Sequence, residues 1–331
     1  MVTMSDVARE AGVSVMTVSH ILNGRPRASE ATRQRVLDVV AELGYEINLT
    51  ARGLRSGRTN TVALIVPSFH DYFGEIADRL AVLLEASGLH LVLERTAGTA
   101  EHERDALSLA RLKMYDGVLL SAHGISREEL ETVSAAVPLV LLGERRMPDD
   151  IDHVRLDNVE GARLATEHLI ARGARRIALL GGAFETEPGM ASSRREGWEI
   201  AHGEAGLTHD PRLITPVEDY SMDCARTAMR ALLDSGQHVD GVFAITDVVA
   251  QGALSALGER GLRVPDDVQV VGFDDLEIDE FMTPGLTSVN PNHELLASTA
   301  VRLLTERIAG RSRAAVHEVI PVRLVERGST R

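Results

Sequence analysis

The sequence of 331 residues contains one cysteine, Cys224, and it lacks any apolar run of the length that a membrane span requires. A single cysteine excludes a disulfide within the chain and is typical of proteins from a reducing compartment. The N-terminal stretch MVTMSDVARE has early acidic residues and no apolar core of signal-peptide length. A membrane helix needs about 20 apolar residues. We therefore expect a cytoplasmic protein with no membrane partner.

The chain also lacks a net positive charge. Its formal net charge of -14 argues by itself against a nucleic-acid partner, because attraction to phosphate requires clustered Lys and Arg. The charge is unevenly distributed, however: residues 1–58 hold eight arginines and six acidic residues, whereas the remainder carries a net charge of -16. Such asymmetry is expected when a short basic module is attached to an acidic body, and the length allows two or three domains.

Three short helices are predicted at the N-terminus. Thr3, Ser14 and Ser29 each precede apolar residues at helical spacing, so we expect each of them to cap a helix. Glycines follow the periodic segments, as they often do at helix ends. A three-residue turn containing glycine joins the first two helices, which predicts a helix-turn-helix.

The second of these helices has an outward face that suits DNA. That face is expected to carry Val15, Met16, Ser19 and His20, and the N-terminal residues of such a helix reach base edges in a major groove. Short polar groups and loop arginines suited to phosphate are Thr17, Ser19, Asn23, Arg25 and Arg27. Because any small helical bundle exposes polar residues, a purely structural bundle remains an alternative at this point.

Residues 60–331 alternate between strand and helix signals. Eight strands are predicted, in two groups of four: TVALIVP, LHLVLE, DGVLLS and PLVLLG, then RIALLGG, RLITPV, DGVFAIT and VQVVGF. Amphipathic segments such as 73–87 and 158–171 lie between them. Apolar strands separated by helices indicate parallel sheets that are covered on both faces. We therefore predict an all-α headpiece followed by an α/β body of two Rossmann-like lobes with a cleft.

Ligands of open α/β sheets bind beyond the carboxyl ends of the strands. The residues at those places are Ser68, Phe69, Tyr72, Phe73, Ser121, Gly143, Glu144, Thr246, Asp247, Phe273, Asp274 and Asp275. Aromatic, hydroxyl and carboxylate groups suit a neutral, hydroxyl-rich molecule or a flat heterocycle. A core position for Phe273 and a solvated turn for Asp274 and Asp275 remain alternatives.

Signatures of catalysis are missing from the sequence. No His or Cys lies at ligand spacing near the carboxylate pair, so we expect no metal site. Dinucleotide, P-loop and nucleophile-elbow patterns are also absent. We therefore expect no cofactor and no enzyme activity.

Two N-terminal segments carry a family resemblance. MSDVAREAGVSVMTVSHILNG and SEATRQRVLDVVAELGYEINLTARGLRSGRT closely resemble the DNA-binding headpiece and hinge of the lactose/galactose repressor (LacI/GalR) family of bacterial transcription regulators. The resemblance implies that Val15, Met16 and His20 read bases. It implies backbone contacts for Thr3, Ser14, Ser19, Asn23, Arg27, Ser29 and Thr32. Many members have Arg where this chain has His20, and His makes one hydrogen bond where Arg makes two, so we expect a different half-site.

The segment NLTARGLRSGRTN, residues 48–60, is polar and basic, yet Leu54 lies in it without periodic apolar neighbours. The short helix predicted there begins at Asn48 and contains Ala51, Arg52, Leu54 and Arg55. A helix of this length is marginal in water, and composition alone favours a flexible tether. The resemblance implies instead a hinge helix that folds on operator DNA, where paired leucines wedge into a minor-groove step.

The body resembles the family's effector-binding domain, which shares its fold with periplasmic sugar-binding proteins. The segments are SSRREGW, ITDVVAQGAL, GLRVPDDVQVVGFDD and PGLTSVNPNHELLASTAVRLLTERIAG. The resemblance implies that Arg194 and Asp247 anchor the effector and that Phe73 and Tyr220 stack on it. The full set expected to bind it is Ser68, Phe69, Tyr72, Phe73, Ser121, Arg194, Tyr220, Asp247, Phe273 and Asn290. Thr246 stands where Asn is common, which leaves both a sugar and a nucleoside-like effector open.

Together these features predict a DNA-binding domain (1–46), a hinge (47–59), and an effector-binding and dimerisation domain (60–331). The lobes are expected at about 60–157 plus 288–315 and at about 158–287 plus 316–331. Because one helix-turn-helix buries too little surface for tight specific binding, we expect a homodimer on a near-palindromic, double-stranded operator. The sequence ends in VERGSTR without heptads, so a coiled-coil tetramer is not expected.

The expected function is a transcriptional repressor that a small metabolite controls allosterically. A solute-binding protein, which needs export, and a Rossmann-type enzyme are the alternatives. Induction and corepression are equally compatible with the sequence.

Overall fold

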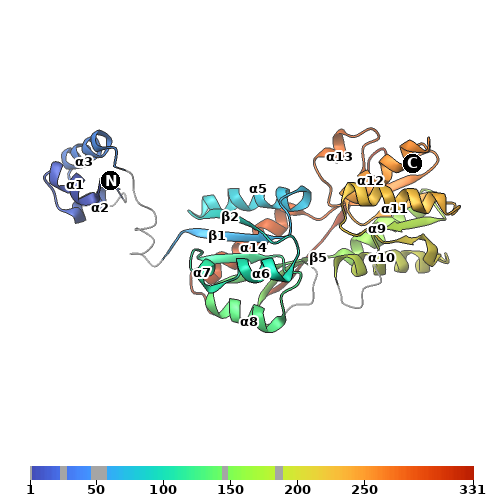
Figure 1. Cartoon of the computed structure of the whole chain (residues 1–331), viewed down its shortest axis with the longest axis horizontal. Coiled ribbons are helices and arrows are strands. Elements are labelled where there is room, and N and C mark those ends of the chain that lie inside the picture. The colour runs from blue at the N-terminus through green and yellow to red at the C-terminus, as the bar shows by residue number, and fades with distance from the viewer. Residues whose placement is uncertain (1, 23–27, 46–57, 144–147, 183–188) are drawn as a thin grey trace. The chain divides into compact units, whose positions relative to one another are not determined.

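The computed structural model describes residues 2–22, 28–45, 58–143, 148–182 and 189–331 (Figure 1). By its internal contacts the chain divides into two units, Met1–Thr59 and Asn60–Arg331. The predicted hinge residues Asn48, Ala51, Arg52, Leu54 and Arg55 lie outside the described ranges, as do Asn23, Arg25, Arg27 and Glu144. No helix in the described ranges is long and apolar enough to cross a membrane.

The N-terminal unit contains the three predicted helices: α1 (Met4–Glu10), α2 (Val15–Leu22) and α3 (Glu30–Leu43). Thr3 caps α1, as the sequence predicted, and it forms a reciprocal capping box with Asp6. Helix α3 ends at Gly44, whose φ of 61° lies in the left-handed region that favours glycine. The buried residues of the unit form one small core: Val7, Ala8, Ala11, Val18, Ile21, Val36 and Val39.

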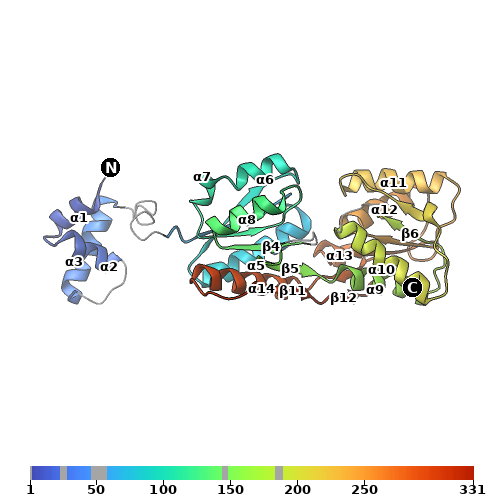
Figure 2. The same cartoon turned by 90° about the horizontal axis from the view of Figure 1, so that it is seen from below.

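The first sheet of the body has the strand order β11-β5-β4-β3-β1-β2, and all its strand pairs are parallel. Its strands are β1 (Thr61–Val66), β2 (His90–Arg95), β3 (Gly117–Leu120), β4 (Leu139–Leu142), β5 (Asp152–Leu156) and β11 (His317–Ile320). One face is covered by α5 (Asp71–Ala86) and α14 (His293–Ile308) (Figure 2). The other face is covered by α6 (Ala100–Ala106), α7 (Leu109–Leu112) and α8 (Arg127–Ala136).

The second sheet has the order β12-β10-β9-β8-β6-β7, and only the β10–β12 pair is antiparallel. Its strands are β6 (Ile177–Leu180), β7 (Ile214–Thr215), β8 (Gly241–Ala244), β9 (Gln269–Phe273), β10 (Thr287–Asn290) and β12 (Arg323–Val325). Figure 1 shows α9 (Asn158–Ala171) and α10 (Met190–Glu204) on one side, and α11 (Met222–Asp234) and α12 (Asp247–Glu259) on the other. A 3-10 turn (Pro211–Leu213) and the short helix α13 (Ile278–Phe281) complete the lobe.

Strand β1 shows why the apolar segments form central strands. Val62, Leu64 and Val66 pack with α5 and α14, whereas Ala63 and Ile65 pack with the helices on the opposite face. Side chains alternate between the two faces of a strand, so a strand covered on both sides is apolar throughout. The two-lobed α/β body that the sequence predicted is therefore confirmed.

The described residues contain twelve strands rather than the eight predicted. The four additional strands, β5, β10, β11 and β12, are short, and the segments DHVRL, TSVN, HEVI and RLV mix polar and apolar residues. The chain passes between the sheets three times: after β5, after β10, and between β11 and β12. Residues 288–290 thus lie in the second sheet and 317–320 in the first, which differs from the lobe ranges expected from sequence.

Candidate functional site

The exposed face of α2 begins with two apolar side chains. Met16 is 68% and Val15 is 38% exposed, whereas Val18 and Ile21 of the same helix are buried in the core. Apolar side chains held in water at the start of such a helix suit contact with thymine methyl groups in a major groove. His20 is half-buried on the same helix. Contacts of Val15, Met16 and His20 with bases remain predictions.

The hydroxyl groups predicted to contact the DNA backbone lie at helix starts. Ser14 Oγ accepts the Thr17 backbone N–H at 3.1 Å, and Ser29 Oγ accepts that of Thr32 at 3.3 Å. Helix N-termini favour phosphate because their first N–H groups lack helical partners. Thr3 differs, because its hydroxyl donates to Asp6 Oδ2 at 2.6 Å, so a phosphate contact there requires an exchange of partner. Ser19 is half-buried on α2.

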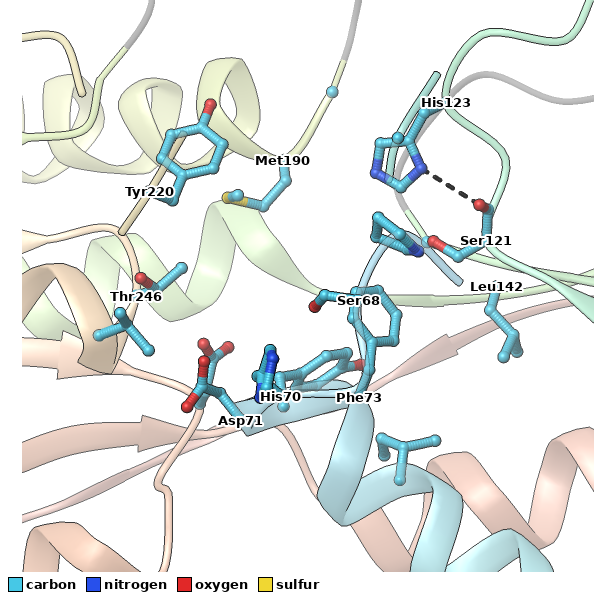
Figure 3. A pocket seen from close by; sticks show the side chains of 18 of the residues that line it. Ser68, His70, Asp71, Phe73, Ser121, His123, Leu142, Met190, Tyr220 and Thr246 are labelled. Carbon is cyan, nitrogen blue, oxygen red and sulfur yellow. Dashed lines mark hydrogen bonds between the residues drawn. The ribbon is translucent and has the colours of Figure 1, made fainter. Parts of the chain in front are cut away.

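A cavity of about 860 Å³ lies in the body, and loops of both lobes form its walls (Figure 3). Ligand cavities in proteins span roughly 300–1,000 Å³. Six of the ten residues that the sequence selected for the effector line it: Ser68, Tyr72, Phe73, Ser121, Arg194 and Tyr220. The cavity therefore lies where the sequence predicted it, at the carboxyl ends of strands from both lobes.

Asp247 does not line the cavity. Its side chain is fully buried, and its carboxylate accepts the Ser288 hydroxyl at 2.6 Å and the Leu276 backbone N–H at 3.1 Å. The structure thus places Asp247 behind the pocket wall, where it supports the loop that carries Asp274. Asp274 is itself part of the lining and is only 6% exposed, so it does not lie in a solvated turn.

Three more selected residues also lie outside the lining. Phe69 is 40% exposed, on the surface near the pocket loop. Asn290 donates from Nδ2 to Asp275 Oδ2 at 2.6 Å, at the carboxyl end of β10. Phe273 is fully buried, as the core alternative for it required, and it contacts the pocket through Arg194.

Arg194, on α10, lines the cavity and is held there by its contacts with neighbouring residues. Its Nε donates to Asn158 Oδ1 at 2.6 Å, and its Nη1 donates to the backbone carbonyl of Ile245. The guanidinium carbon lies 3.4 Å from the centre of the Phe273 ring, a cation–π geometry. Its Nη2 lies 3.7 Å from Asp274 Oδ1. A buried cation and a buried carboxyl group therefore share one end of the pocket.

Burial dominates the ionisation of the carboxyl groups here. It raises the pKa of Asp274 to about 7, against the opposing charge of Arg194. Burial also raises the pKa of Asp247 well above its ordinary value, and it raises the pKa of Asp279 on α13. Near neutral pH, Asp274 can therefore either accept or donate a hydrogen bond to a ligand.

Polar lining residues that the sequence analysis did not select include His70, Asp71, Arg95, His123 and Asp219. The sequence contained a signal for them: Arg95 is the last residue of β2, and Asp71 is the first residue of α5. His70, His123 and Asp219 lie in the loops that follow β1, β3 and β7. Extending the strand-end rule by a few residues would have found them. No group of His, Cys, Asp and Glu residues that could hold a metal ion occurs among the described residues.

Two protein-family descriptions match the chain. Residues 3–48 match "Bacterial regulatory proteins, lacI family", and residues 166–330 match "Periplasmic binding protein-like domain". The HTH-type transcriptional regulator CelR of Thermobifida fusca is 37% identical over 99% of this chain and 98% of its own length. The ribose operon repressor of Halalkalibacterium halodurans is 34% identical over 100% of this chain and 98% of its own length.

Solved structures extend the similarity over both units. A transcriptional regulator CelR–cellobiose complex is 33% identical, with a TM-score of 0.73, over 99% of this chain and 100% of that one. The lac repressor dimer bound to operator and the anti-inducer ONPF is 27% identical, with a TM-score of 0.85, over 99% of each chain. The similarity therefore covers the headpiece and the lobed body together.

Proposed function

The chain belongs to the lacI family of bacterial regulatory proteins and is a DNA-binding transcription regulator rather than an enzyme, and from this premise we propose what it recognises. It represses transcription as a homodimer on a near-palindromic operator, and a sugar in the pocket of the body controls its affinity for that DNA. It acts in the cytoplasm, where the operator lies.

The N-terminal unit supplies the DNA contacts. We assign base contacts to Val15, Met16 and His20 of α2, and phosphate contacts to the polar residues around them: Thr3, Ser14, Thr17, Ser19, Asn23, Arg27, Ser29 and Thr32. One such unit offers a small surface, and specific affinity requires two units on two half-sites. We assign the minor-groove contact between the half-sites to the hinge, with Leu54 as the inserted side chain.

The composition of the pocket lining carries the proposal of a sugar. Arg194 and Asp274 provide charged hydrogen-bonding groups at one end, and Ser121 provides a hydroxyl elsewhere in the lining. Phe73 and Tyr220 provide aromatic surface for the apolar face of a sugar ring. A pyranose presents hydroxyl groups at its rim and C–H groups on its faces, which is the complement of such a lining.

Size and aromatic geometry narrow the ligand further. A cavity of about 860 Å³ leaves room for more than one sugar ring. The Tyr72 and Phe73 rings are 5.2 Å apart with an interplanar angle of 74°, so they do not form the parallel pair that would sandwich a nucleobase. A similar regulator of known structure is bound to cellobiose. We therefore propose a disaccharide, with cellobiose as the first candidate.

A thermal-shift titration of the full chain with cellobiose, glucose and adenosine tests this proposal. A ligand that binds only the folded state adds about 2.7 kcal/mol of stability at a hundred times its Kd. We expect cellobiose to raise the melting temperature most and adenosine not to raise it. Stabilisation by adenosine, and by none of a panel of sugars, would contradict the sugar assignment.

Matched serine variants locate the site in the same assay. Ser121 lines the pocket, whereas Ser126 caps α8 outside it, where its hydroxyl accepts the Glu129 backbone N–H at 3.3 Å. Ser121→Ala should reduce the shift that cellobiose causes. Ser126→Ala should lower the melting temperature of the free protein, through a lost cap of about 1 kcal/mol, and leave the shift intact. Equal shifts in both variants would place the ligand elsewhere.

A further inference from the structure

Glu103 is a charged residue buried in the interior of the first lobe. Its side chain, on α6, has no exposed surface. The carboxylate accepts three successive backbone N–H groups: that of His123 at 2.7 Å on one oxygen, and those of Gly124 at 2.9 Å and Ile125 at 2.8 Å on the other. All three donors belong to the turn that follows β3.

Such an arrangement fixes the turn. Burial of a carboxylate costs several kcal/mol unless hydrogen bonds replace its water, and successive backbone N–H groups form a concave anion-binding nest. The turn also packs tightly on the start of α6, because a Cβ added at Gly124 would lie 2.6 Å from Ala100 Cβ. The turn conformation and the position of Glu103 therefore depend on each other.

The same turn carries two residues of the pocket lining, Ser121 and His123. His123 Nδ1 lies 3.1 Å from the backbone carbonyl of Ser121. A carbonyl can only accept, so Nδ1 donates this hydrogen bond and the ring is fixed in orientation. Figure 3 shows Ser121 and His123 on one side of the pocket, across from Tyr220 and Met190.

We propose that Glu103 is a positioning residue of the effector pocket: it holds the turn 121–125 so that Ser121 and His123 meet the hydroxyl groups of a bound ligand. Glu103 itself touches no ligand. Its effect reaches the ligand through the backbone of the turn and through the ring of His123, whose Nδ1 lies 3.8 Å from Glu103 Oε1. The identification of that ligand as an effector rests on the function proposed above.

Glu103→Gln is the informative substitution, because it keeps the shape of the side chain and replaces one acceptor oxygen with a donor NH₂ group. At least one of the three N–H groups then faces a donor. Hydrogen bonds to charged groups are strong enough that such a loss corresponds to roughly a tenfold change or more in an equilibrium constant. We expect amide hydrogen exchange in 123–125 to be at least about tenfold faster, and the Kd for cellobiose to be about tenfold higher.

Asp240→Asn is the matched control. Asp240 also captures successive backbone N–H groups, those of Arg175 at 3.0 Å and Arg176 at 2.7 Å, and it is not part of the pocket lining. If both carboxylates only stabilise the fold, both substitutions lower the melting temperature and neither changes the Kd for cellobiose. The proposal instead requires that only Glu103→Gln lowers that affinity and loosens residues 123–125.

A double-mutant cycle with His123→Ala tests whether Glu103 affects ligand binding through the turn and His123. If Glu103 acts through the turn, the loss of cellobiose affinity in the double variant is smaller than the sum of the two single losses. The decisive experiment measures amide exchange and cellobiose affinity on the full chain for all these variants. Unchanged exchange in 123–125, or additive affinity losses, would overturn the proposal.

Two further outcomes distinguish a failure of the disaccharide proposal from a failure of the proposal for Glu103. If wild-type protein does not bind cellobiose, the disaccharide proposal fails, whereas the exchange rates still decide whether Glu103 holds the turn. If Glu103→Gln does not fold, His123→Ala alone tests whether His123 contacts the ligand. Undiminished cellobiose affinity in that variant would overturn the proposal.

Discussion

Replacement of Asp274 by asparagine tests the electrostatics at the base of the pocket. Asp274 is 6% exposed, beside the guanidinium of Arg194. Its pKa of about 7 lies far above the ordinary value of 3.8 that the group regains when the chain unfolds. Asparagine has nearly the same shape and does not titrate, so the variant removes this ionisation. It also removes the repulsion by which the Asp274 charge helps to raise the pKa of Asp247.

The sign and size of the effect follow from proton binding. Between pH 4 and pH 7 the folded protein holds a proton on Asp274 that the unfolded chain has released, so the free energy of unfolding falls as the pH rises. This contribution is fully present below the unfolded pKa and is lost as the pH passes through the folded pKa. One unit of pKa difference is worth about 1.4 kcal/mol. From pH 5 to pH 8 the loss from Asp274 is therefore about 2 to 3 kcal/mol.

The assay is urea unfolding at pH 5, 6, 7 and 8, followed by the fluorescence of Trp198, the single tryptophan, which is buried in the body. The free energy of unfolding of the wild-type protein minus that of Asp274→Asn should fall by about 2 to 3 kcal/mol from pH 5 to pH 8. Most of this fall should occur below pH 7. Histidines titrate in both proteins and cancel in the difference. A difference that does not change with pH would refute the raised pKa of Asp274.

Two further predictions concern the hinge and the packing beneath Arg194. Leu54→Ala should weaken binding to operator far more than binding to random DNA, whereas Arg55→Ala should weaken both and lower the salt dependence of binding. Equal losses on both DNAs for Leu54→Ala would exclude the insertion of Leu54 into a minor-groove step. Gly161→Ala should destabilise the body by about 1 to 3 kcal/mol in urea unfolding, because the new Cβ would lie 2.5 Å from a ring carbon of Phe273. Gly203→Ala, whose Cβ would meet nothing within 4 Å, is the control and should be neutral or stabilising, so equal destabilisation in both variants would refute the packing argument.

Local signals were sufficient for much of the fold. The three N-terminal helices follow from caps and apolar spacing, and central strands such as β1 follow from segments that are buried on both faces. Strands β5, β10, β11 and β12 escaped prediction because their segments mix polar and apolar residues. Strand β11 pairs with β5, more than 150 residues earlier in the chain, and no periodicity in the segment HEVI announces that partner.

The pocket was predictable in position but not in the orientation of its side chains. The strand-end rule found Ser68, Ser121 and both Asp247 and Asp274 as candidates. It could not decide which aspartate faces the cavity, because that depends on the backbone after β9. There Asp274 has a φ of 121°, a conformation that its residue type does not announce.

The proposed function requires that a ligand in the pocket of the body controls DNA binding by the headpiece. The most direct test measures the Kd of the full chain for an operator selected from a random DNA pool, with and without saturating cellobiose, at one fixed salt concentration. We expect at least about a fivefold change in that Kd, and by linkage the operator must change the Kd for cellobiose by the same factor. Identical operator affinity with and without bound cellobiose would show that cellobiose in the pocket does not control DNA binding.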